Sequence, residues 1–226
     1  MMDARRAGRP AVARPPVGDA AEAGGLVALG QELAFGPESA ASPLVLAGRG
    51  ILLVALALWS LSFFAIAMDG DRLAASFMHL VHLPFHEAGH ILFMPLGSFL
   101  MALGGTLAQL MVPLLCAGAL LRRRDRFGTA VALWWTGQSL MDIAPYVADA
   151  RALRLVLLGG HTGAEVEGHD WEAILGALGW LRYDVALGRA ANAAGVLLML
   201  AALAWGARVL WRQHRAGRGG DTQSRW

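Results

Sequence analysis

Residues 44–68 read LVLAGRGILLVALALWSLSFFAIAM and contain one charged side chain, Arg49. A helix needs about 20 predominantly apolar residues to cross the hydrocarbon core of a bilayer. The stretch is long enough, and the charged sequence DGDR at 69–72 closes it. It therefore predicts a membrane-spanning helix.

Three further apolar stretches follow, at 73–121, 127–148 and 186–207. The four stretches together contain only these charged residues: Arg49, Glu87, Asp142 and Arg189. The whole chain is 16% charged, whereas soluble domains are near a quarter charged. We therefore expect an all-α, polytopic helical membrane protein with about four to six transmembrane or re-entrant helices.

The basic residues gather at the edges of the apolar stretches, and the net charge is only +2. This pattern argues for orientation in a lipid bilayer and against a nucleic-acid partner. RRRDR at 122–126, together with Arg212, Arg215 and Arg218 near the end of the chain, predicts a cytoplasmic C-terminus. The single cysteine excludes a disulfide framework.

The chain divides into three parts by composition. Residues 1–43 are rich in Ala, Gly, Pro and Arg and predict a disordered tail. Residues 44–212 form the helical membrane domain, in which 149–185 is an extramembrane loop, and 213–226 form a basic tail. If 73–95 crosses the bilayer fully, the N-terminus lies outside. If that segment is re-entrant, the N-terminus lies inside, which its arginines favour.

The sequence HEAGH at 86–90 fits the pattern HExxH. Residues four apart lie on one face of a helix, so His86 and His90 can bind a single zinc ion, Zn²⁺. Glu87 is one residue away, where a carboxylate can act as general base on water. An ionisable residue in an apolar segment is by default a functional candidate, because its burial is costly.

Pro84 is suited to the first turn of a helix, so we expect the HExxH helix to begin near Leu83. His79 and His82 precede it and continue the same helical spacing. A continuous helix would permit a second metal, but an interior proline opposes continuity. We favour His79 and His82 as residues that support the site or line its entry.

A third ligand should come from another segment. Asp142 is the only acid in 127–148, and Gln138 lies one turn before it on the same helical face. The alternative is a carboxylate that caps the helix near Pro145 or pairs with an arginine. The 149–185 loop adds His161, His169 and Asp170; either of the last two is a candidate fourth ligand or substrate contact, and the alternative is a solvated polar residue.

HEAGH in an apolar helix, with an aspartate on a later apolar segment, resembles the site-2-protease class of intramembrane zinc metalloproteases. The resemblance implies His86 and His90 as zinc ligands, Glu87 as catalytic base and Asp142 as third ligand. The class usually places that aspartate in an Asp-Gly motif, whereas MDIAP stands at 141–145 here. A wider stretch, about 60–210, resembles a group of uncharacterised bacterial multi-pass membrane proteins, and this resemblance implies a location in the inner membrane of a bacterium.

The leading hypothesis is a zinc-dependent membrane hydrolase with one zinc ion, acting as a peptidase on a membrane protein or peptide. The zinc ion lowers the pKa of a water molecule toward ~7, and Glu87 accepts its proton. The rival hypothesis is a non-catalytic metal-binding protein, such as a transporter, sensor or assembly factor. The additional histidines His79 and His82 support this rival hypothesis.

Overall fold

A computed structural model describes residues 19–223, and the chain divides into two units, Met1–Gly36 and Pro37–Trp226. The first unit contains helix α1 (Asp19–Phe35). This helix lies within the segment 1–43 that we predicted to be a disordered tail, of which residues 1–18 are outside the described part. We describe each unit by itself.

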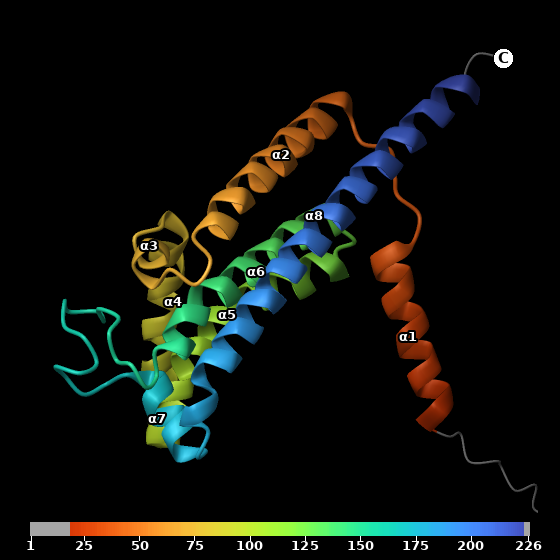
Figure 1. Ribbon diagram of the computed structural model, residues 1–226. Helices are drawn as coiled ribbons and strands as arrows, with labels where there is room; N and C mark the ends of the chain where they lie inside the picture. The colour runs from red at the N-terminus through yellow and green to blue at the C-terminus, as the bar shows by residue number, and fades with distance from the viewer. Residues whose placement is uncertain (1–18, 224–226) are drawn as a thin grey trace, which may run out of the picture. The chain divides into compact units, whose positions relative to one another are not determined.

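The second unit is helical, as predicted, and its only β feature in the described residues is an isolated bridge between Val156 and Thr162. Figure 1 shows its elements. They are α2 (Pro43–Ala65), α3 (Gly70–Ala74), α4 (Phe77–Phe93), the 3₁₀ turn η1 (Met94–Leu96), α5 (Ser98–Arg122), α6 (Arg126–Ala148), α7 (Asp170–Ala177), the 3₁₀ turn η2 (Leu181–Tyr183) and α8 (Asp184–Gln223). Helix α8 thus continues through most of the segment 213–226 that we predicted to be a tail.

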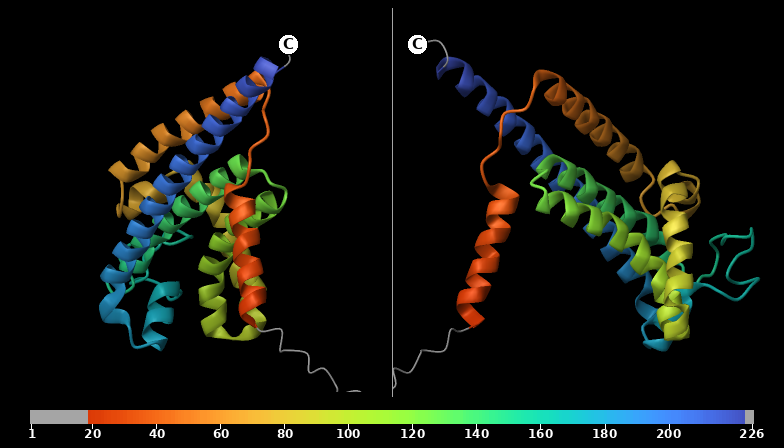
Figure 2. Two further views of the ribbon diagram at one scale, coloured as in Figure 1. Left: turned by 90° about the vertical axis from the view of Figure 1, so that its right-hand side faces the viewer. Right: turned by 180° about the vertical axis from the view of Figure 1, so that it is seen from behind.

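Helix α6 is the central element, and it lies beside α8 in all views (Figures 1 and 2). The two backbones meet at Gly137 and Gly195: a Cβ on Gly137 would lie 2.8 Å from the carbonyl oxygen of Gly195. Small residues allow this close approach, which side chains would prevent. Most of α6 is buried as a result.

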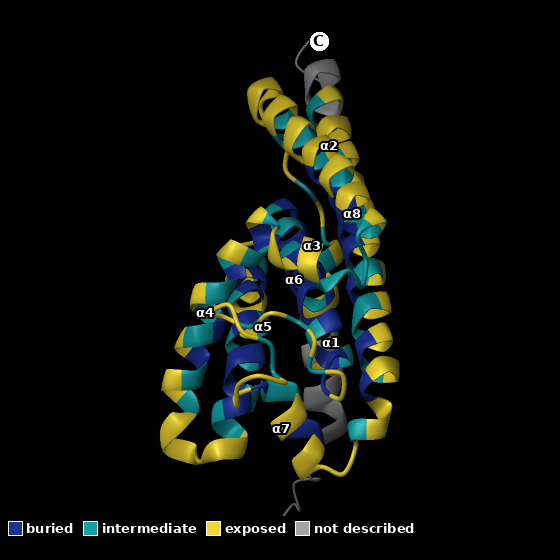
Figure 3. Ribbon diagram, turned by 60° about the vertical axis from the view of Figure 1, so that its left-hand side comes forward, coloured by how far each residue is buried: buried dark blue, intermediate teal, exposed yellow. Residues whose placement is uncertain are grey.

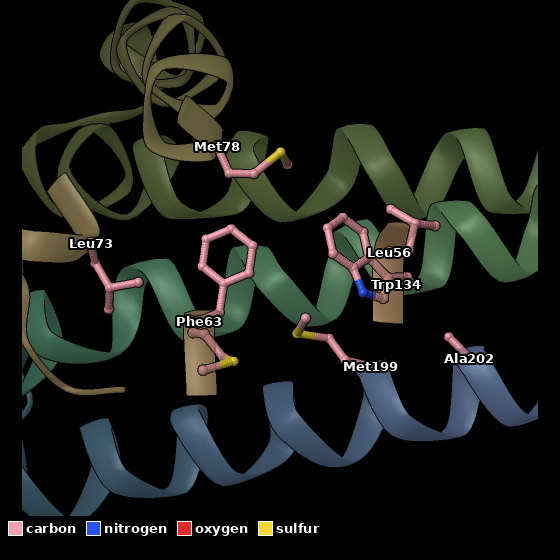
Figure 4. Close-up of a cluster of buried hydrophobic side chains, with 8 residues drawn as sticks. Leu56, Phe63, Leu73, Met78, Trp134, Met199 and Ala202 are labelled. Atoms are coloured by element: carbon pink, nitrogen blue, oxygen red, sulfur yellow. The ribbon is translucent and has the colours of Figure 1, made fainter. Parts of the chain in front are cut away.

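The core lies where α2, α4, α6 and α8 face one another (Figure 4). Trp134 of α6 is at its centre, and its indole N–H donates a 2.8 Å hydrogen bond to Ser60 Oγ of α2. A buried indole N–H needs such a partner. The buried cluster comprises Leu56, Phe63, Leu73, Met78, Trp134, Met141, Met199 and Ala202.

Three helices in the described part of the chain are long and apolar enough to cross a membrane: Pro43–Ala65, Ser98–Arg122 and Leu181–Arg218. Helix α2 is largely exposed, whereas α6 is largely buried (Figure 3). Ile51 and Leu58 are 72% and 63% exposed, so apolar side chains lie on the outer surface of α2. This is the surface expected of a helix that faces lipid rather than water.

Polar contacts join three arginine-bearing segments at one end of the second unit. Arg49 of α2 donates to Gln213 Oε1 of α8 and to Asp125 Oδ1 in the turn before α6, at 2.9 and 3.4 Å. Arg126 forms a 3.0 Å ion pair with Glu38. The start of α2, the α5–α6 turn and the C-terminal part of α8 therefore lie at the same end.

Helix α4 begins earlier than the sequence suggested. It starts at Phe77, after Ser76, whose Oγ accepts a hydrogen bond from His79 N at 3.2 Å. Our prediction of a start near Leu83 was wrong, because the Ser76 cap initiates the helix six residues before that point. Pro84 lies inside the helix, on its exposed side. The sequence PLGS at 95–98 predicts a break within the apolar stretch 73–121, because proline and glycine interrupt helices. The structure confirms it: Gly97, with φ of +98°, separates η1 from α5.

Candidate metal centre

Helix α4 places its four histidines toward the other helices. Apolar side chains point outward from the opposite face, with exposed fractions of 61% at Leu80 and 70% at Ile91. His79 and His90 are half-buried. The buried residues of α4 follow the spacing of a single helical face: Met78, His82, His86 and Gly89.

Glycines bring α5 against the HExxH turn of α4. A Cβ on Gly89 would collide with the carbonyl oxygen of Gly104, so the two backbones are in direct contact. At Gly105 a Cβ would lie 2.6 Å from Nε2 of both His86 and His90. The absence of a side chain at Gly105 therefore leaves room beside both ring nitrogens.

Three potential ligands converge beside this space. Asp170 Oδ2 lies 3.1 Å from His86 Nε2 and 3.3 Å from His90 Nε2. The ligand atoms of these three residues all lie within 4.8 Å of one another, and they form the only such group among the described residues. Asp170 was predicted only as a candidate fourth ligand or substrate contact, and it occupies the place beside the two imidazoles that we had assigned to Asp142.

The hydrogen bonds made by the two Nδ1 atoms determine which nitrogen of each imidazole can bind a metal. His90 Nδ1 donates to the carbonyl oxygen of Met101 at 2.8 Å, because a carbonyl can only accept. His86 Nδ1 likewise faces Gln109 Oε1 at 3.0 Å. When neutral, both rings therefore carry their proton on Nδ1 and present an unprotonated Nε2 toward Asp170. A histidine that binds a metal through Nε2 requires this tautomer.

His86, His90 and Asp170 favour the binding of positive charge among them. Two Nε2 lone pairs and the Asp170 carboxylate face the same point, and they repel one another unless a cation or a proton lies among them. A buried charge is tolerated only when it is compensated. The candidate site is therefore suited to bind a cation.

Helix α7 and Tyr146 hold Asp170 in place. His169 caps the helix, because its Nδ1 accepts a 3.1 Å hydrogen bond from Glu172 N. Burial lowers the pKa of His169, which keeps this ring neutral. Tyr146 of α6 donates its hydroxyl to Asp170 Oδ2 at 3.2 Å and accepts from Asp170 N at 2.9 Å. His169 thus supports Asp170 and is not part of the ligand group.

Asp142 belongs to a second cluster on the other side of Gln109. Its carboxylate lies 3.2 Å from His79 Nδ1 and 3.1 Å from His82 Nδ1, and it accepts from Gln109 Nε2 at 3.0 Å. Trp135 Nε1 donates to His82 Nε2 at 2.9 Å. His82 must then carry its ring proton on Nδ1, which directs that proton to Asp142 and leaves no nitrogen of His82 open to a second metal.

The remaining predicted residues lie in different environments. Glu87 is half-buried, and its charge is close enough to act on both His86 and Tyr146. Gln138 is fully buried, and neither of its amide atoms has a hydrogen-bond partner in the described part of the chain. His161 is exposed in the loop, where its carbonyl accepts from Leu157 N, and it is outside the ligand group.

The residues present fit a zinc ion. Zinc prefers tetrahedral sites with imidazole and carboxylate ligands at about 2.0–2.2 Å, for which the ligand–ligand separation is roughly 3.3 Å. The observed separations from Asp170 Oδ2 to the two Nε2 atoms, 3.1 and 3.3 Å, match this value. Three protein ligands leave a fourth position for water or substrate, as in catalytic zinc sites.

Tyr146 and the Met101 carbonyl were not predicted as parts of the site. For Gly104-Gly105 with Gln109 the sequence favours core packing, with a close helix approach beside the site as the alternative. Gly105 and Gln109 had a usable signal, since they lie one helical turn apart on α5 and share the face toward α4. Tyr146 lies one turn after Asp142 on α6, which is a similar signal. No sequence signal points to the Met101 carbonyl, because every residue has a backbone carbonyl.

No protein-family model, no curated protein and no solved structure matches this chain.

Proposed function

We propose that this protein is a membrane-embedded, zinc-dependent peptidase that cleaves membrane-associated proteins or peptides, as the resemblance of HEAGH to the site-2-protease class implies. The observation that carries the proposal is the convergence of His86 Nε2, His90 Nε2 and Asp170 Oδ2 within 4.8 Å. In the neutral rings both Nε2 atoms are unprotonated, because the partners of Nδ1 hold the ring proton there, and Gly105 leaves space beside them.

The ligands in this proposal are His86, His90 and Asp170. When bound, a zinc ion supplies a Lewis acid that polarises a carbonyl and acidifies water. Glu87 would act as the general base: it would take a proton from the attacking water and pass it to the leaving amine. Its position next to His86 in the HExxH sequence supports this role.

The membrane assignment rests on three helices that are long and apolar enough to cross a bilayer. The arginine-bearing end, where Arg49 contacts Asp125 and Gln213, would face the cytoplasm under the positive-inside rule. Because Pro37 and Glu38 contact Arg126 at the same end, the N-terminal side of α2 would also be cytoplasmic. This supports a segment 73–95 that does not cross the bilayer fully.

A second candidate is a metal-carrying protein without hydrolytic activity. The position of Asp170 in the chain favours it, because Asp170 follows a largely exposed connection from residues 149 to 169. A ligand on such a segment is suited to release as well as to binding. The same ligand group therefore fits transfer of a metal.

The Glu87→Gln variant separates the two candidates. Purified protein in detergent, loaded with one equivalent of zinc, is incubated with a fluorescein-labelled single-span peptide, and products are analysed by mass spectrometry. The peptidase proposal expects Glu87→Gln to keep its zinc while cleavage falls by about 10²–10⁴-fold. The control is Glu167→Gln, at an exposed loop acid, which should cleave normally. Loss of zinc from Glu87→Gln would contradict the proposed role.

A further inference from the structure

Gln109 connects the two polar clusters by one continuous chain of hydrogen bonds. Its amide nitrogen donates to Asp142 Oδ2 at 3.0 Å, and its amide oxygen faces His86 Nδ1 at 3.0 Å. A carboxylate can only accept, so the amide must turn its NH₂ group toward Asp142. The oxygen then faces His86, which must donate its Nδ1 proton.

Asp142 is itself held from two further sides. His82 Nδ1 and His79 Nδ1 approach its oxygens at 3.1 and 3.2 Å. The His82 ring is fixed by the indole N–H of Trp135, which is always a donor and so keeps the His82 proton on Nδ1. Only 7% of Asp142 is exposed, and a buried carboxylate stays charged where such donors compensate it.

We infer that Gln109 and Asp142 are positioning residues of the metal centre: Asp142 orients the Gln109 amide, and that amide fixes the proton of His86 on Nδ1. The inference rests on the proposed metal centre and extends it. Asp142 then acts through Gln109 instead of binding the metal, and its three hydrogen-bonding neighbours already occupy its oxygens. Partners of this kind orient metal-binding histidines and raise their basicity.

Removal of the Gln109 oxygen frees the His86 proton to move to Nε2, where it competes with a metal. The test uses Gln109→Met, similar in size but without the acceptor, and Asp142→Asn, which removes the charge. Thr136→Ala is the matched control: this buried threonine of α6 bonds only the carbonyl of Ala132. Gln109→Glu keeps an oxygen acceptor for His86 but loses the N–H that Asp142 accepts, so it tests the His86 half of the link by itself.

Two measurements are made on each variant in detergent. Competition with a chromophoric chelator gives the zinc affinity and stoichiometry. NMR of protein labelled with ¹³C and ¹⁵N in histidine, free of zinc, gives the His86 tautomer. We expect Gln109→Met and Asp142→Asn to bind one zinc ion about 10–100-fold more weakly. We expect the His86 proton to shift toward Nε2 in Gln109→Met. Thr136→Ala should match the wild type, and Gln109→Glu should keep the wild-type tautomer.

A folded Gln109→Met protein with wild-type zinc affinity and tautomer would overturn the inference. So would zero zinc in Asp142→Asn together with full zinc in Asp170→Asn, because Asp142 would then be a ligand. These results are distinct from failure of the proposed function. An enzyme that binds zinc and cleaves nothing leaves the inference intact, and the tautomer reports on Gln109 even if the wild type binds no zinc.

Discussion

Asp170 Oδ2 lies 3.1 Å from His86 Nε2, although 84 residues separate the two along the chain. The first belongs to α7, after a largely exposed connection, and the second to the inward face of α4. Tyr146 lies beside both residues: its hydroxyl donates to Asp170 Oδ2 at 3.2 Å, and its ring centroid lies 6.3 Å from that of His86. The following predictions depend on this site or on the helices that build it.

Gly105→Ala should weaken zinc binding by at least about tenfold. The added Cβ would lie 2.6 Å from Nε2 of His86 and of His90, so the two rings must move apart to accept it. Such overpacking also costs roughly 1–3 kcal/mol of stability. The control is Gly118→Ala on the same helix, where a Cβ meets nothing within 4 Å. Chelator competition measures the affinity of both variants, and equal affinities would contradict the proposed position of the site.

Gly137→Ala should destabilise the helical unit by roughly 1–3 kcal/mol, from the cost of overpacking. A Cβ there would lie 2.8 Å from Gly195 O and 2.9 Å from Met199 N, both backbone atoms that cannot rotate away. Thermal unfolding in detergent, with Gly118→Ala as reference, measures the loss. An unchanged midpoint for Gly137→Ala would mean that α6 and α8 are farther apart than described.

Glu38→Gln should destabilise the arginine-bearing end of the molecule. Its carboxylate pairs with Arg126 at 3.0 Å, and the side chains are only 6% and 3% exposed. Removal of one charge of a buried ion pair costs up to about 3–5 kcal/mol, and less where the remaining charge has further partners. Glu165→Gln, at an exposed loop position, is the control in the same unfolding assay. A loss no larger than that of the control would show that the pair is solvated.

Residues 40 and 216 should lie on one side of the membrane and residue 158 on the other. Ala40 Cβ lies 4.0 Å from where a Cβ on Gly217 would be, whereas Leu158 is 70% exposed in the connection that follows α6. Single cysteines are introduced as Ala40→Cys, Ala216→Cys and Leu158→Cys in a Cys116→Ala background. An impermeant maleimide added to intact bacterial spheroplasts should label only the Leu158→Cys protein. Labelling of Ala40→Cys without Ala216→Cys would require a different number of crossings.

The sequence predicted the all-helical fold because its signals are local, whereas the predicted four to six transmembrane or re-entrant helices are not confirmed: three helices in the described part are long and apolar enough to cross a membrane. Apolar runs such as 44–68 and the break near Gly97 depend on neighbouring residues only. The start of α4 was predicted too late because Pro84 was given more weight than the Ser76 cap. Inside a packed bundle, a helix can tolerate an interior proline that a short peptide would not.

The site was predicted only in part for a related reason. HExxH fixes His86 and His90 by helical spacing, which is local. The third member of the ligand group depends on how α7 folds back, and no spacing rule gives that contact. Asp142 satisfied the sequence criteria because it is a lone acid in an apolar helix. The structure places it with His79 and His82 instead, and Gln109 joins it to His86 by hydrogen bonds.

X-ray absorption spectroscopy of zinc-loaded protein tests the central claim most directly, when the wild type is compared with Asp170→Asn. The account predicts one zinc ion per chain with two imidazole nitrogens and carboxylate or water oxygens at about 2.0–2.2 Å. In Asp170→Asn it predicts loss of zinc or replacement of an oxygen ligand. A wild-type spectrum without histidine ligands, or an Asp170→Asn protein whose zinc content and spectrum equal those of the wild type, would contradict it.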